Sequence, residues 1–264
     1  MVPFLSFNKG PTQRKKPRRL PAAEGPAAAE EADDAPGGGE VRSMVLCGME
    51  VFEPPDNEGG ITVETLRIKF NHPFKDERPK VSVALCSIDA KQTVQEQATM
   101  EFAALGASVG EHTDAYFDIV VKYAPGFTTR KVGVSWLASP ARNRGLQHGT
   151  VEIPWRSDSQ RCYSGFVEFQ SKFKYLPKVR VALAMVNATP PVAMRSIGVE
   201  VRVDACNPSG FAYTVRNMGD YYLRGANVTW IATDDGWSAV DENAIVPAGV
   251  FIGNNFRFSG SHEP

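Results

Sequence analysis

The sequence contains the same short strand pattern twice. Pro-Lys-Val-x-Val-Ala-Leu occupies residues 79–85 and returns at residues 177–183. The similarity continues on both sides of this pattern, with four further matched positions: Phe70 and Phe169, Phe74 and Phe173, Phe117 and Phe211, and Trp136 and Trp230. The loops between these positions differ little in length, as expected for two copies of one design. The chain is therefore predicted to contain two similar domains in tandem.

Both copies have the pattern of β-strands. Runs such as "KVSVALCSI", "YFDIVVKY" and "RKVGVSWLA" are rich in Val, Ile, Phe and Tyr, and they alternate apolar with polar residues. The segment "EQATMEFAALGASV" comes nearest to a helix, although its second half also suits a strand. We predict an all-β chain of two tandem antiparallel β-sandwiches, in which Trp136 and Trp230 take equivalent core positions.

The predicted domain boundaries follow these patterns. Residues 1–42 are basic at first and then rich in Ala, acidic residues and Gly, so they are predicted to be a disordered tail that cannot bury enough apolar surface to fold. The first sandwich is expected over residues 43–140 and the second over residues 145–235. Residues 236–264 form a C-terminal extension, which could add a hairpin, pack as a strand on the second copy, or swap into a neighbouring chain.

Charge and hydropathy argue against several classes of protein. The 264 residues carry a formal net charge of −1, which argues against nucleic-acid binding by the chain as a whole. No segment approaches the roughly 20 consecutive apolar residues of a membrane span, and the start of the chain lacks the features of a secretory signal. The expected location is the cytoplasm, or the cell exterior after non-classical secretion.

No catalytic or metal-binding constellation is visible in the sequence. The four cysteines form no CxxC motif, and surface or turn positions are expected for the four histidines, which are His72, His112, His148 and His262. Asn227 matches the N-glycosylation pattern, but it lies inside a predicted strand and the match is expected to be coincidental. The chain is predicted not to be an enzyme and to need no cofactor or metal.

Four features of the repeat point to a known family. They are "F…P-x-V" at the first strands, the end of the second strand at Ser87-Ile88-Asp89, an aromatic residue opening the fourth strand, and "V-S-W-L-A" closing the fifth. Over about residues 61–139 and 160–233 the chain resembles the H-type lectin domain, the family of snail agglutinins and of the C-terminal domains of discoidins. This resemblance implies a six-stranded antiparallel sandwich, and trimers that bind N-acetylgalactosamine or galactose in clefts between subunits.

The resemblance also suggests binding residues in the second copy. Galactose-type sugars need a carboxylate and a guanidinium for their hydroxyls and an aromatic ring for their apolar face. Asp158 falls close to a family Asp, Arg202 flanks the position of a family Arg, and Arg224 stands where the family has a Tyr. Two aromatic residues lie in the same turn, so the candidate carbohydrate-binding residues are Asp158, Arg202, Tyr221, Tyr222 and Arg224.

Two functions therefore stay open. The main prediction is a carbohydrate-binding lectin for N-acetylgalactosamine- or galactose-type glycans, acting in agglutination, cell adhesion or defence. Its expected partners are glycans or glycoconjugates and further copies of itself in a trimer-like homo-oligomer, because several sites together raise avidity. Glu101, Ala124 and Met218 replace residues of the family's sugar site. These replacements favour the alternative, a protein–protein interaction module that keeps the sandwich and has lost sugar binding.

Overall fold

The computed structural model describes residues 45–53, 61–71, 73–74, 78–92, 103–123, 127–141, 143, 145–154, 161–189, 196–218, 222–234 and 255–259. The tail predicted over residues 1–42 lies outside these ranges. The elements within them are all β-strands joined in antiparallel sheets, which confirms the predicted all-β fold. No helix in the described part of the chain is long and apolar enough to cross a membrane.

The first repeat forms a six-stranded unit. Its strands are β1 (Leu46–Phe52), β2 (Thr62–Lys69), β3 (Lys80–Gln92), β4 (Ala103–His112), β5 (Tyr116–Tyr123) and β6 (Phe127–Ser139). They form two three-stranded layers, β1-β6-β3 and β2-β5-β4. The segment that comes nearest to a helix in the sequence becomes strand β4 in its described part.

The second repeat has the same strand order. Its strands are β7 (Leu146–Ile153), β8 (Cys162–Glu168), β9 (Lys178–Thr189), β10 (Ser196–Asn207), β11 (Gly210–Asn217) and β12 (Tyr222–Thr233). The layers are β7-β12-β9 and β8-β11-β10, and β13 (Asn255–Ser259) extends the second layer at β10. The C-terminal extension thus contributes a strand to the second repeat.

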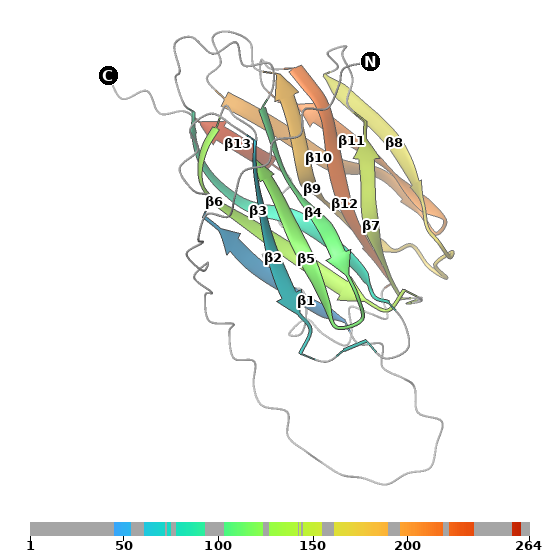
Figure 1. Cartoon of the computed structure of the whole chain (residues 1–264). Helices are drawn as coiled ribbons and strands as arrows, with labels where there is room; N and C mark the ends of the chain where they lie inside the picture. Colours follow the sequence, from blue (N-terminus) through green and yellow to red (C-terminus); the bar gives the residue numbers. More distant parts are fainter. Residues whose placement is uncertain are drawn as a thin grey trace, which may run out of the picture.

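The two units share one sheet. Strand β4 of the first unit pairs with β9 of the second, so a continuous sheet runs in the order β2-β5-β4-β9-β12-β7 (Figure 1). The pairing is short, from Ala103 opposite Ala188 to Gly106 opposite Met185. Backbone hydrogen bonds therefore connect two units that each have a core of their own.

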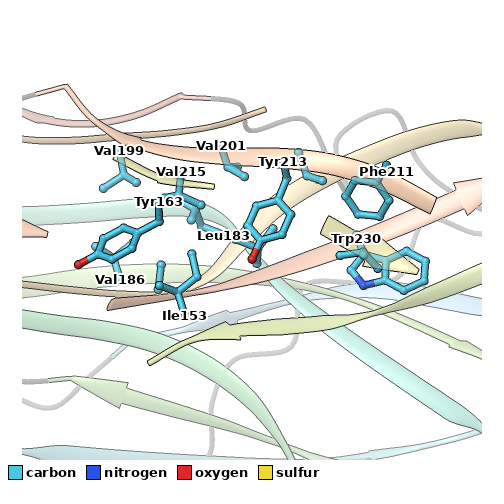
Figure 2. Close-up of a cluster of buried hydrophobic side chains, with 14 of the residues drawn as sticks. Ile153, Tyr163, Leu183, Val186, Val199, Val201, Phe211, Tyr213, Val215 and Trp230 are labelled. Atoms are coloured by element: carbon cyan, nitrogen blue, oxygen red, sulfur yellow. The ribbon is translucent and has the colours of Figure 1, made fainter. Parts of the chain in front are cut away.

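A column of aromatic rings fills each core. In the first unit the Phe117 and Trp136 ring centroids lie 5.2 Å apart in an edge-to-face arrangement. In the second, Phe211 and Trp230 repeat this contact at 5.6 Å, and Figure 2 shows their rings facing each other between the sheets. Edge-to-face pairs of this kind add stability beyond their buried area. Trp136 and Trp230 hold equivalent core positions, as predicted.

Backbone hydrogen bonds fix the phenylalanines of this column in the same way in both units. Phe70 N–H donates to Ala115 O and Phe74 N–H to Asp114 O, each at 2.9 Å. In the second unit the matching donors are Phe169 and Phe173, which bond to Ser209 O and Pro208 O, again at 2.9 Å. In each unit the segment after the second strand, β2 or β8, is therefore held against the hairpin loop before the fifth strand, β5 or β11.

A glycine lies across the strand pair from each tryptophan. Gly48 is paired with Trp136 between β1 and β6, and Gly149 is paired with Trp230 between β7 and β12. A Cβ at Gly48 would lie 2.6 Å from the Trp136 ring, whereas a Cβ at Gly149 would lie 3.2 Å from the Trp230 ring. Paired residues share one face of a sheet, so the indole excludes a side chain at Gly48 and leaves only limited space at Gly149.

The outer faces of β1-β6-β3 and β7-β12-β9 pack against each other. This junction core contains three pairs of equivalent residues from the two units: Val45 with Leu146, Ala84 with Ala182, and Leu137 with Ile231. The Thr229 hydroxyl also donates to Val83 O across the junction at 2.6 Å. The two repeats are therefore held together by a small apolar core as well as by the β4–β9 pairing.

His148 lies buried at this junction, on strand β7, which contradicts the surface or turn position expected from the sequence. Its Nδ1 lies 2.7 Å from the Ser82 hydroxyl and its Nε2 lies 2.9 Å from the Ser139 hydroxyl, both in the first unit. Burial, together with the positive charge of Lys80, lowers the pKa of His148 to about 3. The neutral imidazole donates to one hydroxyl and accepts from the other, so the ring links the two units.

The glycines allow a matched test of the tryptophan contact. Gly48→Ala should lower the free energy of unfolding by about 1–3 kcal/mol, because the new methyl group overlaps the Trp136 ring. Gly149→Ala should change it by less than about 1 kcal/mol, because a small shift accommodates the methyl group and alanine suits a strand better than glycine. Urea denaturation measures both. Equal losses for the two variants would contradict this account.

His148 should make the stability depend on pH in a defined window. The pKa of His148 is lowered on folding, so below pH about 6.5 the unfolded chain binds a proton that the folded chain does not. Stability is complete above that pH and should fall, as pH drops toward about 3, by up to about 1.4 kcal/mol per pH unit. Denaturation at pH 6.5 and 5.0 checks this, and His148→Gln should flatten the difference. An unchanged slope in that variant would assign the effect to other groups.

Candidate functional site

The structure describes only some of the five residues predicted to bind sugar. Asp158 and Tyr221 lie outside the described residues, and Tyr222 is described only as the first residue of β12. Arg224 is half-buried on β12, and Arg202 is exposed on β10. Since β12 and β10 belong to the two opposite layers of the second unit, Arg202 and Arg224 do not lie on one surface.

Arg202 is engaged on its own sheet. Its Nε donates to Asp204 Oδ1 at 2.8 Å, and the other oxygen of Asp204 accepts a hydrogen bond from the Thr214 hydroxyl at 2.5 Å. Val201 and Val203 on either side of Arg202 pack in or against the core, so the guanidinium points away from the sandwich. This part of the predicted site is an exposed ion pair on the outer face of β10.

A second charged cluster lies on the outer face of β2 and β5 in the first unit. Arg67 donates two hydrogen bonds to the carboxylate of Asp118, at 2.8 and 2.9 Å, and one to Glu111 at 2.9 Å. Its guanidinium lies 4.0 Å from the centre of the Tyr116 ring. The hydrogen bond from Arg67 lowers the pKa of Asp118. These groups have the chemistry of a sugar site, but they bind one another.

A cavity of about 280 Å³ lies where the two units meet. It has walls from β3 and β4 of the first unit and from β7, β9 and β12 of the second. Its polar lining residues are Lys80, Ser82, Ser108, Thr150 and Asn227, and its apolar lining includes Val81, Val83, Ala107, Val109 and Ala184. This volume is slightly below the range for ligand sites, roughly 300–1,000 Å³.

Lys80 gives this cavity its charge. Its ammonium nitrogen lies 5.7 Å from the centre of the Trp230 ring of the other unit, and burial lowers its pKa. No acidic side chain is among the residues that line the cavity. The cavity is therefore electropositive and favours electron-rich ligand atoms such as hydroxyl or carboxylate oxygens.

Asn227 supplies an unpaired acceptor. Its side-chain oxygen is buried and has no hydrogen-bond partner among the described residues. The Ser82 hydroxyl, in contrast, is bound to His148, and the Thr150 hydroxyl lies 3.3 Å from that of Thr229. A buried acceptor without a donor costs free energy, so each such atom in a native structure calls for a ligand or water that donates to it. A hydroxyl that enters the cavity can donate to Asn227 and accept from Lys80.

Sequence reasoning missed both residues for a physical reason. Lys80 belongs to the repeated Pro-Lys-Val pattern, so it reads as part of the shared scaffold, and its counterpart Lys178 is exposed. Asn227 corresponds to Gly133 in the first unit, and this difference between the repeats was a usable signal. Only the packing of one repeat on the other places Lys80 and Asn227 around one cavity.

Comparisons with known proteins give one family match, and it lies in the second unit. The family model of the H-type lectin domain matches residues 164–233, from within β8 to the end of β12. No second match covers the first repeat. No curated protein and no solved structure matches the chain. Within the described residues no group of three or more side chains could hold a metal ion. Residues 164–233 therefore match the H-type lectin domain, and they lie in the second of two units with the same strand topology.

Proposed function

We propose that the chain binds carbohydrate in the cavity between its two units, with one N-acetylgalactosamine- or galactose-type sugar residue held there. The observation that carries the proposal is the combination of Lys80 from the first unit and the unpaired Asn227 oxygen from the H-type lectin domain in one cavity. Lectins of this family are typically not enzymes. Such binding would act in agglutination, cell adhesion or defence.

The chemistry of the cavity fits a sugar residue. Each sugar hydroxyl can donate one hydrogen bond and accept others, which matches an amide oxygen that needs a donor and an ammonium that needs an acceptor. Val81, Val83, Ala107, Val109 and Ala184 provide apolar lining for the C–H groups of the ring. These apolar side chains would contact the face of the sugar for which the sequence predicted an aromatic ring.

The residues predicted from the sequence define an alternative position for the sugar. Asp158, Tyr221, Tyr222 and Arg224 would bracket a sugar at the turn that precedes β12, in the manner that the family resemblance implies. Self-association belongs to the same proposal, because further copies would multiply weak sites and raise avidity. The two positions differ in the residues they need, so variants can separate them.

Glycan-array binding by the full chain tests the function and the position together. Lys80→Met and Asn227→Ala should each weaken binding to terminal N-acetylgalactosamine or galactose by about tenfold or more, which corresponds to one lost hydrogen bond to a charged or buried group. Lys178→Met is the matched control, because Lys178 is the exposed counterpart of Lys80, and it should bind like the wild type. Asp158→Ala should have no effect.

Other outcomes decide between the alternatives. If Asp158→Ala abolishes binding and Lys80→Met does not, the sugar is bound at the turn before β12. If the folded wild-type chain binds no glycan, the carbohydrate proposal fails and the interaction module becomes the better reading.

Asn227→Ala should also separate ligand binding from folding. Since the Asn227 side-chain oxygen has no partner among the described residues, its removal should change the free energy of unfolding by less than about 1 kcal/mol, or raise it. Thermal or urea denaturation without sugar measures this. A loss of more than about 2 kcal/mol would show that the amide stabilises the fold, and would remove the argument that it awaits a ligand.

A further inference from the structure

The hydroxyl of Thr150 lines the cavity, and its proton is already in use. The Thr229 hydroxyl donates its own proton to Val83 O. In the contact between the two threonine hydroxyls, at 3.3 Å, Thr150 is therefore the donor. A hydroxyl has one proton and two lone pairs, so Thr150 offers a ligand only the acceptor capacity of its oxygen.

Ser82 is left as an acceptor in the same way, through His148. The Ser139 hydroxyl donates to Pro140 O at 3.1 Å, so it accepts from Nε2 of His148 at 2.9 Å. The neutral imidazole then carries its proton on Nε2, and its Nδ1 accepts from the Ser82 hydroxyl at 2.7 Å. The Ser82 oxygen, which also lines the cavity, has lone pairs to offer and no proton.

The side-chain oxygen of Asn227 adds a third acceptor to the cavity. It is buried and has no hydrogen-bond partner among the described residues. Three acceptors that line one cavity require a ligand with several O–H donors. The oxygens of a carboxylate can only accept hydrogen bonds, so these three positions are unfavourable for an anionic group.

Lys80 has the opposite requirement. It is the one charged side chain among the described residues that line the cavity, and no carboxylate in the described part of the chain pairs with it. Its contact with the Trp230 ring, at 5.7 Å, is a weak substitute for a counter-ion. Burial lowers the pKa of Lys80, as expected for an ammonium that loses water without gaining a negative partner. A ligand carboxylate would supply that charge in a charge-assisted hydrogen bond.

An acidic side chain beside Asn227 sets the orientation of such a ligand. Glu152 of β7 is paired with Asn227 of β12, so the two side chains share one face of the sheet. Glu152 is exposed and does not line the cavity. Its negative charge disfavours a carboxylate near Asn227, which leaves Lys80 as the place for one.

We infer that the sugar residue held in this cavity is acidic, a galactose-type uronic acid whose carboxylate binds Lys80 and whose ring hydroxyls donate to Asn227, Thr150 and Ser82. Since it names the sugar class for the same cavity, the inference rests on the proposed function. Galacturonic acid differs from galactose only in having a carboxylate in place of the hydroxymethyl group. The volume of about 280 Å³ favours such a single ring over an acidic sugar with a long side chain.

Isothermal titration calorimetry of the full chain with the methyl glycosides of galactose and of galacturonic acid tests this inference. The wild type should bind the acidic glycoside about tenfold more tightly, because a hydrogen bond to a charged group is the stronger one. Lys80→Met should remove this preference and leave both glycosides equally weakly bound. Lys80→Arg keeps the positive charge and should keep the preference. Lys178→Met, which changes the exposed counterpart, is the matched control and should bind like the wild type.

Asn227→Asp gives a second readout that leaves Lys80 unchanged. The new side chain has nearly the same shape and still accepts hydrogen bonds, so galactose should still bind. The added negative charge repels a ligand carboxylate and competes for Lys80, so the preference for galacturonic acid should disappear. This variant decides the question if Lys80→Met does not fold, as judged by circular dichroism.

The outcomes separate the sugar class from the proposed function. A folded wild-type chain that binds neither glycoside would overturn the proposed function, and the acidic sugar with it. Equal binding of the two glycosides, weakened for both by Lys80→Met, would keep the cavity as the sugar site and overturn the acidic sugar alone. A preference for galacturonic acid that persists in Lys80→Met or in Asn227→Asp would place the carboxylate elsewhere, and would also overturn the inference.

Discussion

The packing of one tryptophan against one strand glycine organises each half of this protein. The indole of Trp136 or Trp230 fills the space between the layers and contacts the phenylalanine column, and it leaves no room for a side chain at Gly48 and little room at Gly149. This contact sets the register of the strand pair, because a shift by one residue would turn every core residue outward. The strands before and after it then follow in the same order in both units.

The cavity in this protein depends on how its two units meet. The junction combines a short run of backbone pairing, a small apolar core and one buried histidine between two serine hydroxyls. Such a junction holds the units in one orientation although its apolar core is small. It also produces the cavity, because the walls come from both units and Lys80 of one reaches toward Trp230 of the other.

Equivalent residues and strands of the two units differ in their surroundings. Lys80 lines the cavity, whereas its counterpart Lys178 is exposed. In the same way the edge of β4 takes up β9, whereas the edge of β10 takes up the C-terminal strand. Equivalent strands therefore have different surroundings in the two units, and Asn227 stands in the second unit where the first has Gly133.

The strands, the internal similarity and the core residues can be predicted from the amino-acid sequence. Alternating apolar residues, the repeated Pro-Lys-Val pattern and the matched Phe and Trp positions are local or internally repeated signals, and they predicted two sandwiches with Trp136 and Trp230 inside. The buried position of His148, the separation of Arg202 from Arg224 and the gathering of Lys80 with Asn227 follow from tertiary packing. Those features depend on which outer faces pack together, and outer faces of a sheet carry few residues that specify a partner. The alternation that marks a strand fixes which side chains point outward and leaves open what they meet.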